Sequence, residues 1–163
     1  MTTSERRVGY RPFPELTKAF VAGRLRPTWK DLGWAATNHW LDAKALADLA
    51  DELAADDEGL RVALALALDN GEAVLAAVLD RQATGYETSE VTVRERWMRL
   101  AVAWLYEHRE MFSDPWAVVE EIWEAFDHAE SLNGLIRWMP VPPGEPSGEA
   151  AMMARWRTYA ESQ

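Results

Sequence analysis

The sequence predicts an all-α protein, a single-domain helical bundle or short helical-hairpin array of about seven to eight helices. Apolar residues recur at spacings of three and four along most of the 163-residue chain. Helix-capping residues, prolines and glycines divide these segments into lengths of about 10–18 residues with short connections. We therefore expect residues 1–163 to form one domain, large enough to bury an apolar core.

The first third of the chain changes character at Thr28. Residues 1–27 are predicted to be largely irregular, with a short helix over 15–22, because three prolines and a glycine interrupt them. Thr28 and Asp31 have the spacing of a capping box for a helix that ends near Trp40. Asp42 then caps a helix over 43–55. Its apolar stripe consists of Leu46, Leu49 and Leu53.

Two further helices are predicted before residue 83. Asp57 caps a segment over 58–68 in which Leu60, Leu64 and Leu68 share one line. The alternation ALALAL over 63–68 is also compatible with a strand, but alanine and leucine favour a helix. Asn70-Gly71 marks a turn, and the apolar spacing resumes over 72–82.

The longest helix is predicted after a loop over 83–90. Thr92 and Glu95 match a capping box at its start. Its buried face is expected to contain Trp97, Leu100, Ala101, Trp104 and Leu105. Ser113-Asp114-Pro115 then starts a helix over 115–126, because proline is favoured at the first helical position.

The C-terminal part is predicted to hold a short helix over 130–138 and a last helix over 150–160. Residues 140–149, PVPPGEPSGE, are rich in proline and glycine and are typical of a linker. In the last helix, Met153, Trp156 and Tyr159 recur at spacings of three, which favours docking onto the body.

The charge is uneven along the chain. The net charge is −10, with +5 over residues 1–30 and −15 over residues 31–163. An acidic surface repels nucleic acid and anionic membranes and favours a basic protein partner. The sequence has no cysteine, no signal-peptide pattern and no apolar run of about 18 residues, so we expect a cytoplasmic protein that binds neither membrane nor nucleic acid.

The sequence shows no recognisable catalytic motif. It lacks hydrolase, phosphate-loop, dinucleotide and zinc patterns, and its three histidines lie on separate segments. Glu124 and His128 are four residues apart, which would place them on one helix face, but a di-metal bundle needs similar elements from several helices. We expect no metal, no cofactor and no enzyme activity. Arg94, Arg96 and Arg99 are expected to form surface ion pairs.

Carboxylate density selects the candidate partner-binding residues. Six carboxylates lie within eleven positions over 48–58, and four more lie near residue 124. They are Asp48, Asp51, Glu52, Asp56, Asp57, Glu58, Glu120, Glu121, Glu124 and Asp127. Two alternatives stay open: an adaptor that uses an exposed groove formed by some of the nine tryptophans, and a metal-dependent enzyme.

Four blocks of the sequence resemble a family of uncharacterised bacterial proteins of similar length. They read LTKAFVAGRL, TWKDLGWAATNHWLD, MRLAVAWLYEHREMFSDPWAVVEEIWEAFDHAESLNGLIRWMPV and ARWRTYAES. The resemblance implies no catalytic residues. Members of this family are similar in size and context to immunity proteins of bacterial toxin systems. The resemblance therefore implies binding to a basic toxin domain.

Overall fold

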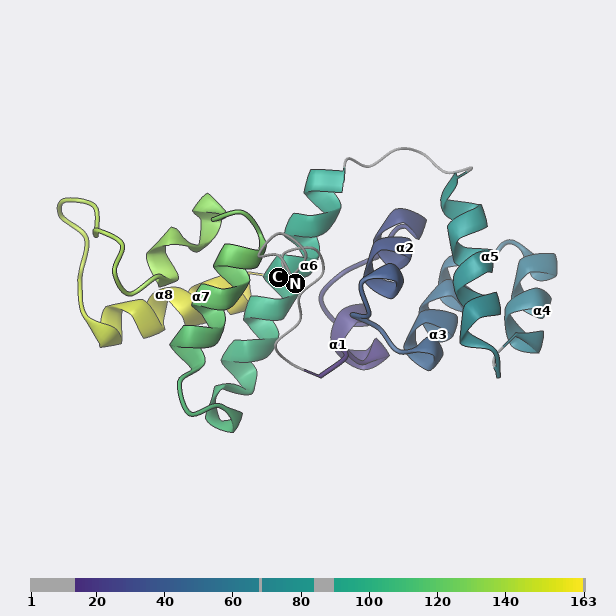
Figure 1. The fold of residues 1–163 in the computed structure, drawn as a ribbon, viewed down its shortest axis with the longest axis horizontal. Coiled ribbons are helices and arrows are strands. Elements are labelled where there is room, and N and C mark those ends of the chain that lie inside the picture. Colours follow the sequence, from purple (N-terminus) through teal and green to yellow (C-terminus); the bar gives the residue numbers. More distant parts are fainter. Residues whose placement is uncertain (1–13, 68, 84–89, 163) are drawn as a thin grey trace, which may run out of the picture. The chain divides into compact units, whose positions relative to one another are not determined.

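The computed structural model describes residues 14–67, 69–83 and 90–162. Their regular structure consists of eight α-helices and two 3-10 helices, together with an isolated β-bridge between Leu16 and Leu41 (Figure 1). The all-α prediction is confirmed. The described residues divide between two compact units, which we call the N-terminal unit, within Phe13–Trp97, and the C-terminal unit, within Met98–Gln163. A single domain over 1–163 stays a prediction.

The N-terminal unit is a set of packed helices. They are α1 (Lys18–Ala22), α2 (Trp29–Thr37), α3 (Ala43–Leu53), α4 (Glu58–Leu66), α5 (Gly71–Ala83) and the start of α6 (Glu90–Glu107). Helix α5 packs against α2, α3 and α4. Helix α4 packs against α3 and α5 and lies at an edge of this unit (Figure 1).

The predicted caps of α2, α3 and α4 are confirmed. The Asp31 amide donates to Thr28 Oγ1 (3.2 Å), and the Thr28 amide donates to Asp31 Oδ2 (2.7 Å), which completes the capping box of α2. Asp42 accepts the Ala45 amide at the start of α3 (2.6 Å). Asp57 caps α4 in the same way. Each of these contacts joins two residues three positions apart, so the sequence alone can predict the caps.

Several helix boundaries differ from the predicted ones. Helix α1 begins at Lys18 rather than residue 15, because Thr17 is its cap and the Leu16 amide donates to the Trp40 carbonyl (2.9 Å). The alternating segment over 63–68 is helical as far as Leu66.

The predicted leucine lines are confirmed only in part. Leu46, Leu49 and Leu64 are buried and Leu60 is half-buried. Leu53, at the end of α3, is 37% exposed, and Leu68 lies outside the described residues.

Three tryptophans form the centre of the N-terminal unit. The Trp34 ring lies 5.4 Å from that of Trp40 and 6.4 Å from that of Trp97, between ring centroids. Nearby, a Cβ added at Gly33 would collide with the side chain of Gln82. The absence of a side chain at Gly33 therefore lets α2 and α5 approach closely.

The long helix α6 starts earlier than its predicted capping box. Helix α6 begins at Glu90, so Thr92 lies inside the helix and the prediction that it caps the helix is wrong. Residues 84–89 of the predicted loop lie outside the described residues, while Ala83 and Glu90 are helical. The predicted buried face of α6 is confirmed, since each of its five residues is buried.

The C-terminal unit contains the rest of α6 and the elements after it. They are η1 (Arg109–Met111), α7 (Pro115–Ala125), η2 (Glu130–Leu135) and α8 (Glu149–Glu161). Asp114 caps α7 and Pro115 is its first residue, as predicted. The helix predicted over 130–138 is a shorter 3-10 helix, because Ile136 already has an extended backbone.

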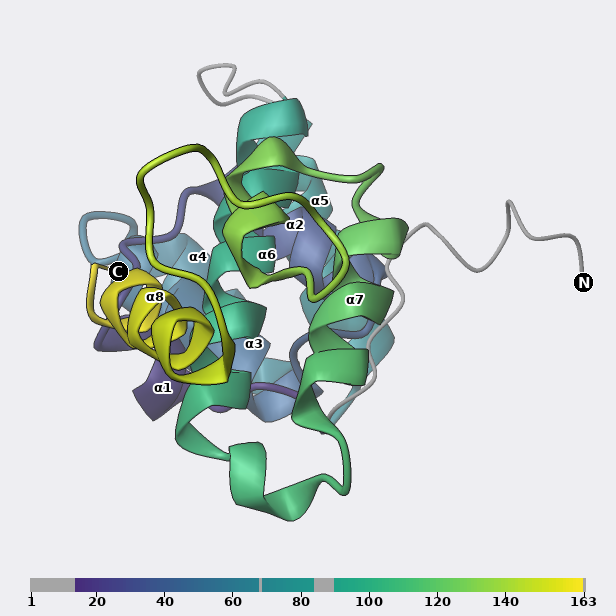
Figure 2. The same cartoon turned by 90° about the vertical axis from the view of Figure 1, so that its left-hand side faces the viewer.

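The proline-rich segment between η2 and α8 is a long loop (Figure 2). Arg155 of α8 donates through Nε to the Gly134 carbonyl (2.8 Å) and through Nη1 to the Pro146 carbonyl (3.0 Å). These bonds fasten α8 to both η2 and the loop. Trp156 is fully buried, while Met153 and Tyr159 are half-buried. Among the described residues, no helix is both long enough and apolar enough to cross a membrane.

Candidate protein-binding surface

The first acidic stretch spans α3, the following turn and the start of α4. Within it, Asp51 pairs with Arg61 (3.0 Å) and Glu52 pairs with Lys18 (2.6 Å). Glu58 lies 3.7 Å from the same arginine. The hydrogen bond that Arg61 donates to Asp51 raises the pKa of Arg61 above its ordinary value, and the bond that Lys18 donates to Glu52 does the same for Lys18. Intramolecular cations therefore offset part of this negative charge.

A surplus of negative charge nevertheless remains on this stretch. Asp57 both caps α4 and lies 3.6 Å from Arg81, whereas Asp56 and Asp48 have no salt bridge among the described residues. Six carboxylates thus face three basic side chains, those of Lys18, Arg61 and Arg81. Over residues 42–83, the sequence has ten carboxylates and three basic residues.

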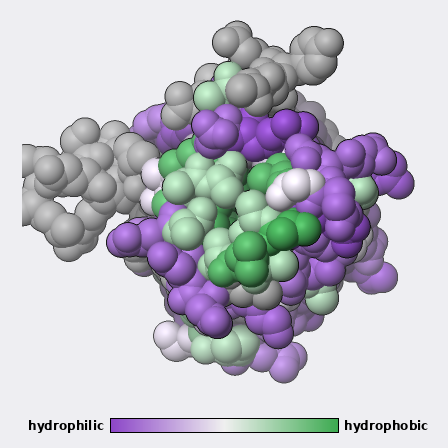
Figure 3. Space-filling view, turned by 90° about the vertical axis from the view of Figure 1, so that its right-hand side faces the viewer, coloured by the Kyte–Doolittle hydropathy of each residue, from purple (hydrophilic) through white to green (hydrophobic). Residues whose placement is uncertain are grey.

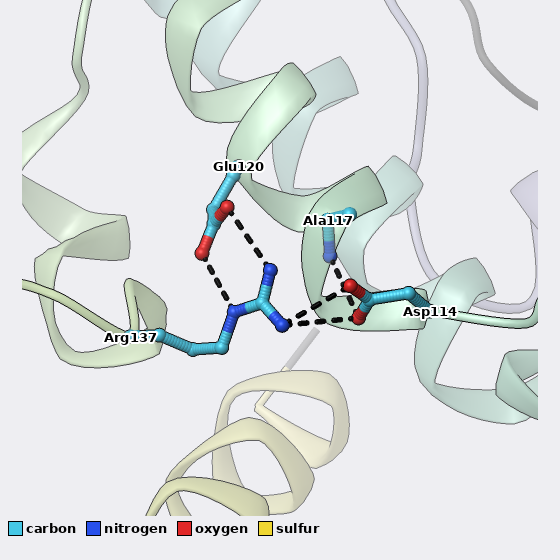
Figure 4. Close-up of polar contacts among 4 residues, drawn as sticks. All are labelled: Asp114, Ala117, Glu120 and Arg137. Atoms are coloured by element: carbon cyan, nitrogen blue, oxygen red, sulfur yellow. Dashed lines mark hydrogen bonds and ion pairs between the residues drawn. The ribbon is translucent and has the colours of Figure 1, made fainter.

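The second acidic stretch contains one strongly neutralised carboxylate. Glu120 accepts two bonds from Arg137, at 2.9 Å from Nε and 3.2 Å from Nη2 (Figure 4). Asp114 accepts from the same guanidinium (3.1 Å) and also from the Ala117 amide. The hydrogen bonds to Glu120, and then those to Asp114, raise the pKa of Arg137 above its ordinary value against the opposing effect of burial. Glu120 is therefore held in a structural ion pair.

The remaining residues of the second stretch do not form a metal site. Glu121 and Glu124 are exposed on α7, but the helix ends at Ala125. Asp127 and His128 have φ values of 56° and 60°, so the chain has left the helical path. Glu124 and His128 would share a helix face only if the helix continued, and it does not. No cluster of three potential metal ligands occurs in the described ranges.

The other predicted polar groups have structural partners. His108 Nδ1 donates to the Trp104 carbonyl at the end of α6 (2.8 Å), as expected for a histidine near a helix C-terminus. Arg96 forms an ion pair with Asp31, but this carboxylate is completely buried. The expectation of a surface ion pair is therefore wrong for Arg96.

The tryptophans contribute little to the surface. Among the nine, Trp138 is exposed (64%), while the others are buried or half-buried. Trp138 packs edge-on against Trp123, with ring centroids 5.2 Å apart. The exposed tryptophans are therefore too few to form a recognition groove of several indole rings.

The outer face of α4 is a feature that the sequence reasoning missed. Val62 is 49% exposed and Leu66 is 84% exposed, and Gly59 and Ala63 on the same face are exposed as well. Figure 3 shows apolar side chains gathered in the middle of this end of the N-terminal unit, surrounded by hydrophilic ones. The composition of α4 could have indicated this face. Its charged residues are Glu58 and Arg61, and its other residues are glycine or apolar.

A hollow also lies in the C-terminal unit, with a volume of about 750 Å³. The proline-rich loop, η2 and α8 line it, and its apolar lining includes Trp116, Ile136 and Met152. Its two arginines, Arg137 and Arg155, are engaged in the intramolecular bonds described above. The hollow therefore presents mainly apolar side chains.

The described fold and surface define a helical protein with an acidic, partly apolar exposed face. Residues 17–163 match the family described as "Uncharacterized protein conserved in bacteria (DUF2247)". The chain belongs to this family. Comparisons with curated proteins and with solved structures find no match.

Proposed function

We propose that this chain is a non-catalytic binding protein of the immunity type, which neutralises a basic toxin domain in the bacterial cytoplasm. The observation that carries the proposal is the surplus of carboxylates on the N-terminal unit after the intramolecular ion pairs are taken into account. Surplus negative charge attracts a basic protein over distances of about a Debye length and accelerates its association. Such a role needs no cofactor.

The first acidic stretch is the proposed contact surface for electrostatic reasons. Asp56 and Glu58 are exposed close together, with Asp48 on the preceding helix. Their side chains cap no helix, and the one ion pair among them, between Glu58 and Arg61 at 3.7 Å, is long and exposed, so a partner can engage them at little structural cost. Glu120 of the second stretch, by contrast, is held by Arg137.

The first experiment is affinity capture from the native bacterium at low and high salt. We expect one basic protein to be recovered at low salt and lost at high salt, because counterions screen exposed charges. The recovered protein is then expressed and its activity is measured with and without the chain. A toxin activity that the chain suppresses supports the proposal. Recovery of no specific partner at either salt concentration contradicts it.

Two charge-reversal variants then test which surface of the chain contacts the partner. The variant D48K/D56K/E58K is compared with E110K/E130K/E145K, which has the same net charge and changes three exposed carboxylates of the C-terminal unit. We expect the first variant to associate with the recovered partner about tenfold more slowly and the control to associate nearly normally. Equal effects of the two variants would indicate net charge rather than a defined surface.

A further inference from the structure

Helix α4 is apolar on both of its sides. Leu60 and Leu64 face α3 and α5, while Val62, Ala63 and Leu66 are exposed on the opposite side. Leu66 is the most exposed large apolar side chain in the described part of the chain. A helix that is apolar all round is normally buried on all sides. No part of the chain that the structure describes covers this face, although its composition favours burial.

The charges around α4 indicate which kind of partner could bind its exposed face. Asp56 and Glu58 lie at the start of the helix, and Asp69 and Glu72 follow its end; these four side chains are all exposed. A second copy of the chain would bring the same carboxylates face to face, and this repulsion opposes a dimer through α4. A partner with basic residues on both sides of an apolar strip meets attraction at each end.

The side chains of the face suit another helix. Gly59 and Ala63 are small, so a second backbone can approach α4 closely at these positions. Val62 and Leu66 lie beside them and can insert between the side chains of an incoming helix. A Cβ added at Gly59 would meet only the Asp57 carboxylate, at 3.7 Å, among the heavy atoms nearby. The approach to α4 is therefore open.

We propose that the outer face of α4 (Gly59, Val62, Ala63 and Leu66) is the docking site for a basic amphipathic helix of another protein. This inference rests on the proposed function, because it specifies which part of the acidic surface contacts the partner and which structure the partner presents. Leu66 and Val62 supply the apolar contact, and the carboxylates at both ends of α4 attract the basic residues that flank the apolar strip of the partner.

The test uses a defined probe, a synthetic 18-residue peptide of leucine and lysine with helical spacing. Its binding to the ¹⁵N-labelled full chain is followed by NMR, and its affinity is measured by calorimetry. We expect the amide signals of Glu58–Leu66 to shift most, and V62S/L66S to weaken binding about tenfold or more. The control M111S removes another exposed apolar side chain, 64% exposed in the C-terminal unit, and should bind as the natural chain does.

The outcomes separate this inference from the proposed function. Normal binding by V62S/L66S, both to the peptide and to the captured partner, overturns the α4 site even if charge reversal still slows association. Dimerisation of the natural chain that sedimentation detects and V62S/L66S abolishes would overturn it in favour of a second copy. Circular dichroism melts confirm folding, since both substituted side chains are largely exposed. Failure to capture a basic partner counts against the proposed function alone, because the peptide measurement is independent of it.

Discussion

The guanidinium of Arg96 lies 3.0 Å from a carboxylate oxygen of Asp31, a residue that is completely buried. The same Asp31 oxygen accepts from the backbone amide and the hydroxyl of Thr28. One carboxylate therefore caps α2 and also fastens α6 to the N-terminal unit.

Removing Arg96 should destabilise the protein strongly. We expect Arg96→Ala to lower the free energy of unfolding by about 3 kcal/mol, because it leaves a buried carboxylate without its cation. The Arg96 side chain is 26% exposed and Thr28 still donates to Asp31, which limits the loss. Urea unfolding followed by circular dichroism measures this loss in the free energy of unfolding. As a control, Arg157→Ala breaks an exposed pair with Glu161 and should change nothing measurable; equal losses would contradict this account.

Trp156 should be the main anchor of α8. Its Nε1 donates to the Val102 carbonyl (3.0 Å), and its ring lies 4.8 Å from that of Trp116, between centroids. We expect Trp156→Ala to cost about 3–5 kcal/mol and Trp156→Phe clearly less, because phenylalanine keeps most of the apolar volume but loses the donor. Thermal unfolding followed by circular dichroism ranks the stabilities of the two variants. A larger cost for phenylalanine than for alanine would argue against packing as the main contribution.

The backbone at Asp127 should favour glycine. Its φ of 56° lies in the left-handed region, which costs about 1–2 kcal/mol for residues with a Cβ. Since both substitutions remove the same carboxylate, we expect Asp127→Gly to be about 1 kcal/mol more stable than Asp127→Ala. Chemical unfolding of the two variants side by side measures the difference. An alanine variant as stable as the glycine variant would contradict the prediction.

Asp114 has two roles, which can be separated by substitution. Asparagine keeps the cap on the Ala117 amide but loses the charge that pairs with Arg137, whereas alanine loses both. We expect Asp114→Ala to cost about 1 kcal/mol and Asp114→Asn to cost less, because asparagine is as good a cap as aspartate. Comparison of the denaturation midpoints tests this; a loss of equal size in both variants would show that the ion pair matters more than the cap.

Local signals made much of the fold predictable. The caps at Thr28, Asp42, Asp57 and Asp114 depend on residues three positions apart, so their pattern is visible in the chain itself. The same locality explains the error at Thr92. A threonine followed by a glutamate three positions later also fits within a helix, and the sequence alone does not show that α6 has already begun at Glu90.

The surface was harder to predict because it depends on contacts between distant residues. Arg137 reaches Glu120 across 17 positions, and Arg61 reaches Asp51 across ten, so the sequence could show the carboxylates but not their neutralisation. The apolar side of α4 was missed for another reason. Leu66 and Leu64 look equally suited to a core, and only the packing of α4 against α3 and α5 decides that one is buried and the other exposed.

The histidine–tryptophan contacts of the C-terminal unit have an optical consequence. The imidazole of His108 is stacked on Trp104, with ring centroids 4.1 Å apart, and that of His128 lies 4.2 Å from Trp123. Indole emission depends on the groups that touch the ring, so replacing His108 or His128 should alter the tryptophan fluorescence of this unit. The chain can therefore report on its own C-terminal unit without an added label.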